Sequence, residues 1–158
     1  MTVDSGAIDT VTPPDVAKAF PIHETQQSKA GINYRAANGS KIRNHGARQV
    51  QGVSNDFKSI NMKMNVADVK KTLAAAIQLN YAGNKVILDG DESYIENKAS
   101  GEIIPLQVVN GEYVFDLWVQ AAAPEQVPVK IKGNRYAALV EEDNDDDDCS
   151  SPFAGQEQ

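Results

Sequence analysis

The sequence predicts a mainly β fold: a small closed or partly open barrel with one or two short helices. Three observations lead to this prediction. Short runs of apolar residues follow one another along the chain, turn-forming residues separate them, and helical periodicity is confined to brief stretches. With 158 residues, of which 41% are hydrophobic and only 6% aromatic, the chain can build one domain around an aliphatic core.

The N-terminal part reads as a strand-like entry and turn over residues 3–11. A pair of prolines ends it, because proline cannot continue the hydrogen-bond ladder of a strand. Thr12 or Asp15 could cap a short helix over residues 16–20. We expect the polar stretch at residues 21–30 to form a loop.

An Asn-Gly pair dominates the next segment. Both residue types tolerate positive φ angles, so the pair predicts a tight turn and a β-hairpin whose tip is Asn38, Gly39 and Ser40. A second turn is expected at residues 44–46. Residues 59–69 then alternate between apolar and polar side chains, which is typical of a half-buried strand. The apolar face of this strand consists of Ile60, Met62, Met64 and Val66.

Residues 69–84 change to a helical period, with alanines between Leu73 and Ile77 and a C-terminal stop at Gly83. Two further hairpins are expected after this helix. The first joins residues 85–89 to 93–97, and the second joins residues 102–106 to 113–119 through another Asn-Gly turn.

These elements suggest four regions. They are a core at residues 1–82, a β-hairpin extension at 83–119, a linker with one further strand at 120–140, and a disordered acidic tail at 141–158.

The net charge of −7 is concentrated in the tail, where residues 141–148 contain seven acids and one asparagine. The remainder is near neutral, so we do not expect direct nucleic-acid binding, which requires a basic surface. Cys149 is the one cysteine, which excludes an intrachain disulfide. The sequence contains no signal peptide and no apolar run of membrane-spanning length, so an intracellular, membrane-free location is expected, with its compartment unknown.

Metal and cofactor chemistry finds little support in the sequence. His23 and His45 have no cysteine or paired carboxylate at ligand spacing, so no metal site is expected. The glycines are scattered at turns and form no phosphate-binding loop. No cofactor is implied.

The triplet Asp4-Ser5-Gly6 is by itself compatible with an ordinary turn. Its context is more specific: Ala7 follows it, and the Asn-Gly hairpin, the alternating strand and the alanine-rich segment come after it in that order. The pattern resembles the retropepsin-like aspartic proteases of retroviruses and long-terminal-repeat retrotransposons. The hairpin residues that carry the resemblance are Ala37, Asn38, Gly39, Ser40, Ile42 and Gly46. Residues 82–119 also look like the region between protease and integrase in retrotransposon polyproteins, so the resemblance covers about residues 2–119.

The resemblance implies a half-pepsin fold and an aspartic endopeptidase, a hydrolase that performs proteolysis on a polyprotein. Asp4 would be catalytic, Ser5 would hydrogen-bond across a two-fold axis, and Gly6 would permit close backbone approach. Only one such triplet is present, so the second carboxylate would come from another chain in a homodimer. Two adjacent carboxylates share one proton, which lets one activate water while the other polarises the scissile carbonyl. The hairpin tip at residues 38–40 would act as a substrate-binding flap.

Alternatives stay open. Only three residues precede Asp4, where the family has a strand, and residues 73–79 contain three alanines where the family usually has a glycine. A catalytically inactive retrotransposon-derived β domain or fragment is therefore the main alternative. A β interaction module with an acidic tail is the third, and in it Asp4 would be a plain turn residue.

Overall fold

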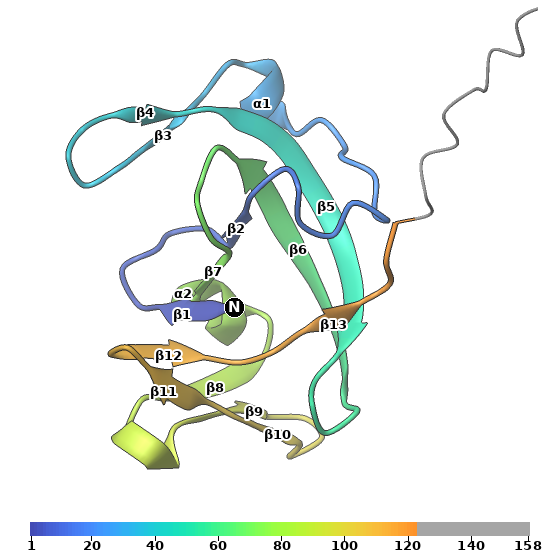
Figure 1. Cartoon of the computed structure of the whole chain (residues 1–158), viewed down its shortest axis with the longest axis vertical. Helices are drawn as coiled ribbons and strands as arrows, with labels where there is room; N and C mark the ends of the chain where they lie inside the picture. Colours follow the sequence, from blue (N-terminus) through green and yellow to red (C-terminus); the bar gives the residue numbers. More distant parts are fainter. Residues whose placement is uncertain (123–158) are drawn as a thin grey trace, which may run out of the picture. The chain divides into compact units, whose positions relative to one another are not determined.

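The computed structural model describes residues 1–122, and the predicted acidic tail and most of the predicted linker lie outside the described residues. The prediction of a mainly β fold with one or two short helices is confirmed, and the described residues contain two, α1 and α2 (Figure 1). In chain order the elements are β1 (Thr2–Asp4), β2 (Val11–Thr12), α1 (Gln26–Lys29), β3 (Tyr34–Arg35), β4 (Lys41–Ile42), β5 (Asn44–Val53), β6 (Ser59–Ala67), β7 (Leu73–Ala75), α2 (Ala76–Tyr81), β8 (Asn84–Ile87), the 3-10 helix η1 (Gly90–Glu92), β9 (Tyr94–Asn97), β10 (Ile103–Pro105), β11 (Gln107–Val109), β12 (Glu112–Val114) and β13 (Trp118–Val119).

The largest sheet has eight strands in the order β11-β12-β1-β7-β2-β6-β5-β13. Within residues 1–122, β11 and β13 form its two edges, so the sheet does not close into a barrel. The β1–β7 and β2–β6 pairs are parallel, and the other pairs are antiparallel. Smaller sheets are formed by β8, β9 and β10 and by β3 with β4.

The long hairpin of β5 and β6 confirms the predicted alternation. Met64 and Val66 are buried, whereas Asn61 and Lys63 are exposed on the same strand. The turn predicted at residues 44–46 is wrong, because these residues begin β5 and form a bulge against β6. Gly46 has a φ of +122°, and its main chain lies against His23, which explains a glycine inside a strand.

Two N-terminal predictions are also wrong. Residues 16–20 form turns and no helix, since the buried Arg48 guanidinium binds the main chain of Pro14 and Val16 and holds this segment against β5. The predicted loop at 21–30 contains α1. Thr25 and Ser28 form a capping box that starts this helix.

The predicted helix over residues 69–84 is confirmed only in its second half. Residues 73–75 form β7, where Ala74 and Ala75 are fully buried between β1 and β2. Small side chains suit a central strand that is crowded from both faces. Helix α2 follows, and Gly83, with a φ of +88°, ends it as predicted.

The C-terminal strands pair differently from the prediction. The pairing of β8 with β9 is confirmed, but residues 103–105 pair with β9 and extend that sheet. The Asn110-Gly111 turn is confirmed, with φ angles of +51° and +78°, and it joins β11 to β12. The prediction that residues 102–106 pair with 113–119 is therefore wrong.

One apolar cluster joins the C-terminal strands to the strand that carries Asp4. Its buried members are Val3, Ala74, Leu79, Ile95, Leu106 and Phe115. Residues on both sides of position 82 thus share one core, and β12 pairs directly with β1.

Candidate active site

Asp4 is the last residue of β1, and Ser5 and Gly6 form the bend that follows it. The Gly6 main-chain N–H donates a hydrogen bond of 2.8 Å to Asp4 Oδ1. This contact orients the carboxylate, which is half-buried, while Ser5 and Gly6 are exposed. A methyl group at position 6 would lie 3.4 Å from Asp4 Oδ1, so glycine leaves this side of the carboxylate open.

The strand that ends at Asp4 lies inside the sheet. Strand β12 pairs with one edge of β1, and β7 runs parallel to the other edge with Asp4 opposite Ala75. Because β7 lies between β1 and β2, the loop of residues 5–10 must pass around the end of β7. Strand β1 is therefore paired on both edges, with β12 at Thr2 and with β7 as far as Asp4.

Hydrogen bonds from three other elements fix the 5–10 loop. The buried Thr10 hydroxyl accepts from the main-chain N–H of Ala75 at 3.1 Å, and the Thr10 carbonyl accepts from Asn65 at 2.9 Å. Gln78 on α2 donates from Nε2 to the carbonyl of Ile8 at 3.1 Å. The loop is thus tied to β6, β7 and α2.

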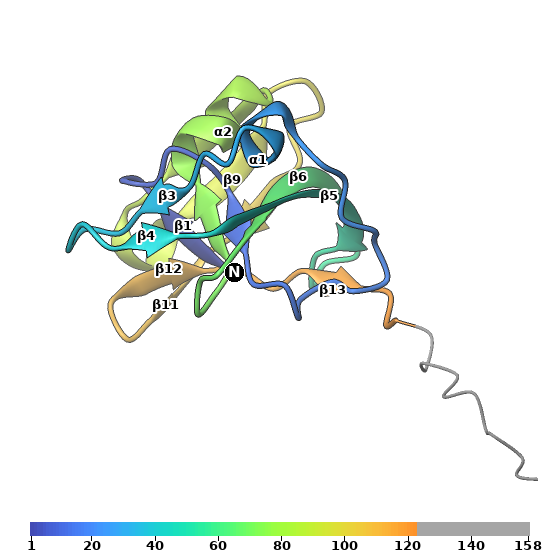
Figure 2. The same cartoon turned by 90° about the horizontal axis from the view of Figure 1, so that it is seen from above.

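The predicted Asn-Gly hairpin is confirmed as β3 and β4, with Tyr34 opposite Ile42. At its tip, Gly39 has a φ of +83°, and Asn38 Oδ1 accepts from the Ser40 N–H at 3.0 Å. The three tip residues are exposed. Figures 1 and 2 agree that this 34–42 hairpin extends on the side of the molecule that carries β1 and its following loop.

Tyr34 connects this hairpin to the loop after Asp4. Its hydroxyl donates to Asp9 Oδ2 at 3.4 Å. Burial of the phenol and the nearby Asp9 carboxylate raise the pKa of Tyr34 to about 12, because burial desolvates the phenolate and the Asp9 carboxylate repels its negative charge. The contact spans 25 residues of sequence, so no local motif could have indicated it.

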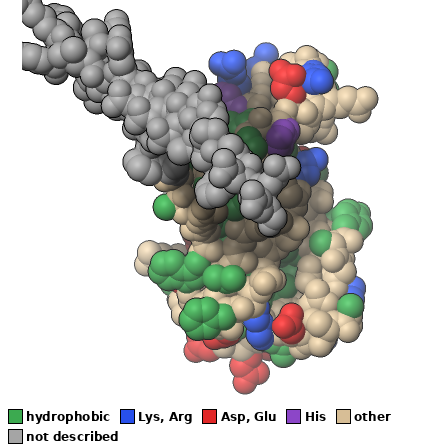
Figure 3. All heavy atoms as spheres, turned by 90° about the vertical axis from the view of Figure 1, so that its right-hand side faces the viewer, with side chains coloured by type: hydrophobic (Ala, Val, Ile, Leu, Met, Phe, Trp, Pro, Cys, Tyr) green, Lys and Arg blue, Asp and Glu red, His purple; other side chains and the backbone are tan. Residues whose placement is uncertain are grey.

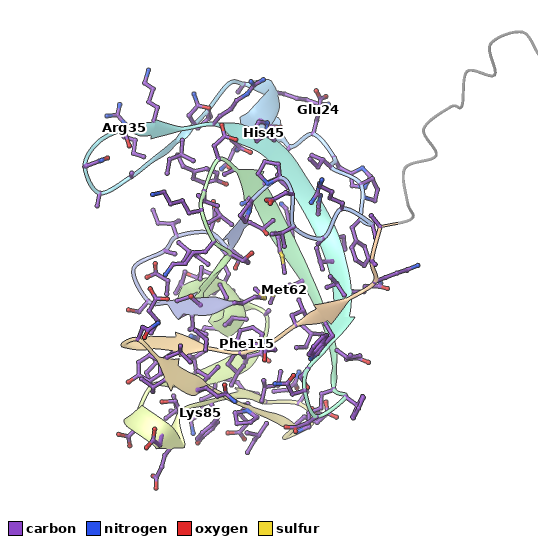
Figure 4. All side chains as sticks on the ribbon, in the orientation of Figure 1. Glu24, Arg35, His45, Met62, Lys85 and Phe115 are labelled. Atoms are coloured by element: carbon purple, nitrogen blue, oxygen red, sulfur yellow. The ribbon has the colours of Figure 1, made fainter. Side chains whose placement is uncertain are left out.

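Asp68 contacts residues where β4 of the hairpin leads into β5. His45 Nε2 lies 2.6 Å from Asp68 Oδ1, and the Asp68 N–H donates to the carbonyl of Arg43 at 3.2 Å. His45, the second residue of β5, therefore contacts a carboxylate. Figure 4 labels His45 at the upper end of this strand. Sequence reasoning missed this role as well as those of Asp9, Thr10 and Tyr34.

The Asp4 carboxylate forms no hydrogen bond with another carboxyl group within residues 1–122. Asp89 and Asp91 are two aspartates close together in the sequence, and they lie at η1. On the face shown in Figure 3, Lys and Arg side chains are interspersed with Asp and Glu. One described chain therefore presents one oriented aspartate, an adjoining exposed bend and an exposed hairpin.

Within residues 1–122 no group of three or more His, Cys, Asp and Glu side chains is arranged to hold a metal ion. Neither α1 nor α2, the helices of this part, has the length and apolar character to cross a membrane. Comparisons with protein-family models, with curated proteins and with solved structures found no match.

Proposed function

We propose that this chain is a retropepsin-like aspartic endopeptidase domain of a retrotransposon polyprotein. It acts as a homodimer in which Asp4 of each chain supplies one carboxylate. The observation that carries the proposal is the position of Asp4: it ends a central strand, its carboxylate is oriented by Gly6, and the bend beside it is exposed.

The neighbouring elements support the same function. Strand β7 lies between β1 and β2 in the sheet, and the family resemblance expects a strand behind the active loop. The 34–42 hairpin has an exposed, glycine-containing tip on the same side of the molecule, as a flap over a peptide requires. The contact between Tyr34 and Asp9 connects this hairpin to the loop that follows Asp4.

The proposed chemistry needs two carboxylates at close range. Such a pair shares one proton over a broad acidic range, since two adjacent negative charges repel. The ionised member removes a proton from water, and the protonated member donates to the scissile carbonyl. Ser5 would hydrogen-bond across the two-fold axis and hold the two loops together.

Exposed apolar side chains near the 5–10 loop support self-association. Ile8 is 81% exposed and lies within this loop. Ile77 and Tyr81 are exposed on α2, one helical turn apart, and the intervening Gln78 is bonded to Ile8. Contact with a second copy would remove this apolar surface from water.

The test is cleavage of a peptide library at mildly acidic pH over a range of protein concentrations. We expect activity that rises more steeply than linearly with concentration and is abolished by Asp4→Asn. Asp91→Asn is the matched control, because it removes an exposed carboxylate at η1 and should leave cleavage unchanged. Sedimentation of the same samples should show a dimer at the active concentrations.

Cleavage that persists in Asp4→Asn would refute the proposal. A folded protein that dimerises but cleaves nothing would favour the alternative, a catalytically inactive domain of the same descent. A folded monomer without activity would favour a β interaction module.

A further inference from the structure

A hollow lies between β6 and the layer formed by α2 and the β8–β10 sheet, and Asp4, Ser5 and Gly6 are not among the residues that line it. Its volume is about 340 Å³. Its apolar lining includes Met62, Leu79, Ile104 and Phe115. Figure 4 labels two of these side chains, Met62 and Phe115, near the centre of the fold. The volume lies at the lower end of the range for ligand sites in proteins.

One wall of the hollow is unusual, because residues 58–63 all line it. Side chains of successive strand residues point to opposite faces, so a hollow on one face would be lined by every second residue. Lining by consecutive residues means that the hollow runs along the main-chain edge of β6. This is the geometry of a groove beside a strand.

That edge of β6 carries unpaired main-chain groups. Strand β5 pairs with β6 along its whole length, but β2 covers the other edge only at Asn65 and Val66. The Asn65 N–H donates to Thr10 on that second edge. By strand periodicity, Lys63 and Asn61 direct their N–H and C=O groups to the same edge. Among the described residues, no strand pairs with them there.

The rim of the groove is more basic than acidic. Lys58 and Lys63 line it together with one acid, Glu102. Lys58 already donates to the carbonyl of Ile103, whereas Lys63 is exposed and forms no ion pair within residues 1–122. An acidic side chain on a ligand would therefore find a cation beside the unpaired edge.

We propose that this groove binds an extended peptide segment, which adds to β6 as a strand along residues 59–63. Its main chain pairs with Asn61 and Lys63, its apolar side chains enter the hollow on one face, and an acidic side chain lies near Lys63. A strand is the ligand that satisfies a row of unpaired N–H and C=O groups, and alternate side chains supply specificity. The inference stands independently of peptide hydrolysis at Asp4.

The experiment uses the full chain labelled with ¹⁵N and an acetylated hexapeptide that alternates aspartate with valine or isoleucine. We expect the amide signals of Asn61 and Lys63 to shift on titration and to become protected from hydrogen exchange. The same peptide with a central proline is the ligand control, because proline removes a main-chain donor. It should bind about tenfold more weakly, the loss of roughly one hydrogen bond.

Two variants of one residue separate main-chain pairing from charge. Lys63→Pro removes the outward N–H while leaving the bonds between β5 and β6 intact, so the protein should fold and lose peptide binding. Lys63→Ala keeps the N–H and should retain main-chain pairing with weaker binding of acidic peptides. Retention of the unfolding midpoint in both variants shows that the fold is unaffected.

Binding that is equally strong in Lys63→Pro would overturn the proposal, as would the absence of any shift at Asn61 and Lys63. Protection of these amides without added peptide would also overturn it. Protection that is independent of concentration would assign the groove to the chain's own residues, and protection that increases with concentration would assign it to a second copy.

Discussion

The Tyr34 hydroxyl donates a hydrogen bond to Asp9 Oδ2 across 3.4 Å, and this contact joins the 34–42 hairpin to the loop that follows Asp4. Asp9 also accepts from Gln78 Nε2 at 3.4 Å through its other oxygen. One carboxylate thus lies between a hairpin strand and α2. A displacement of the hairpin must break or carry along a contact with the loop that orients Asp4.

The first prediction concerns the titration of Tyr34. Its pKa is raised to about 12 by burial and by Asp9, so the phenol should ionise later than the usual value of 10.0. Because the folded state holds this proton more tightly, the associated stability is fully present below pH 10.0 and is lost as the pH rises through about 12. Absorbance of tyrosinate, recorded for the protein and for Tyr34→Phe, isolates the Tyr34 step by difference.

An Asp9→Asn variant is the matched test of the cause. Removal of the carboxylate charge should lower the pKa of Tyr34 toward its ordinary value, although burial would still keep it raised. A difference titration centred at the ordinary tyrosine pKa in the unmodified protein would contradict the Tyr34–Asp9 contact.

The second prediction concerns Thr10, whose hydroxyl accepts from the main-chain N–H of Ala75 in the buried centre of the sheet. Thr10→Val keeps the side-chain shape but leaves this N–H without its partner. We expect a loss of about 1–3 kcal/mol in the free energy of unfolding, measured by urea denaturation. Thr10→Ser keeps the hydroxyl and should be less destabilising. Equal effects of the two substitutions would show that methyl packing, and not the hydrogen bond, matters here.

Local chemistry made part of this fold predictable. The two Asn-Gly turns form as expected because positive φ angles are cheap for these residues, as at Asn110 and Gly111. The alternation of apolar and polar residues along β6 could also be predicted, since it reflects which face of the strand packs against the core. The sequence also indicated Asp4 and the hairpin tip as candidate site residues, because each belongs to a short motif of neighbouring residues.

The unpredicted features depend on partners distant in sequence. Residues 73–75 have a helical pattern but form β7, because β1 and β2 pair with the two edges of this segment and both of its faces are buried, as at Ala74 and Ala75. Arg48 binds the carbonyl of Pro14 across 34 residues, and this tertiary bond replaces the expected helix with turns. Neither the pairing of β10 nor the Tyr34–Asp9 contact leaves a signal in neighbouring residues.

The third prediction concerns Gly46 in the bulge of β5. A Cβ atom there would lie 2.3 Å from the carbonyl oxygen of His23, which also accepts from the Ala47 N–H. We expect Gly46→Ala to cost about 1–3 kcal/mol by strain and to break the His23–Ala47 bridge. Thermal unfolding and hydrogen exchange at Ala47 measure the two effects.

Gly39 offers the control for this substitution. Its φ is also positive, at +83°, but a Cβ atom at Gly39 would meet nothing within 4 Å. Gly39→Ala therefore carries the backbone cost without the clash and should destabilise less. If Gly39→Ala were as damaging as Gly46→Ala, the close approach to His23 would not be the reason for glycine in β5.

The last prediction concerns Arg48, which is 5% exposed on β5. Its Nη2 donates to the carbonyl of Pro14 at 3.0 Å, and Nη1 donates to that of Val16. Arg48→Met fills similar space without donors and leaves both carbonyls unpaired. We expect a loss of about 1.5–3 kcal/mol in the free energy of unfolding, and faster proteolysis within residues 13–20. Arg48→Lys can reach only one carbonyl, so its free energy of unfolding should lie between those of the unmodified protein and Arg48→Met. Unchanged proteolysis in Arg48→Met would mean that the segment is held by its own packing.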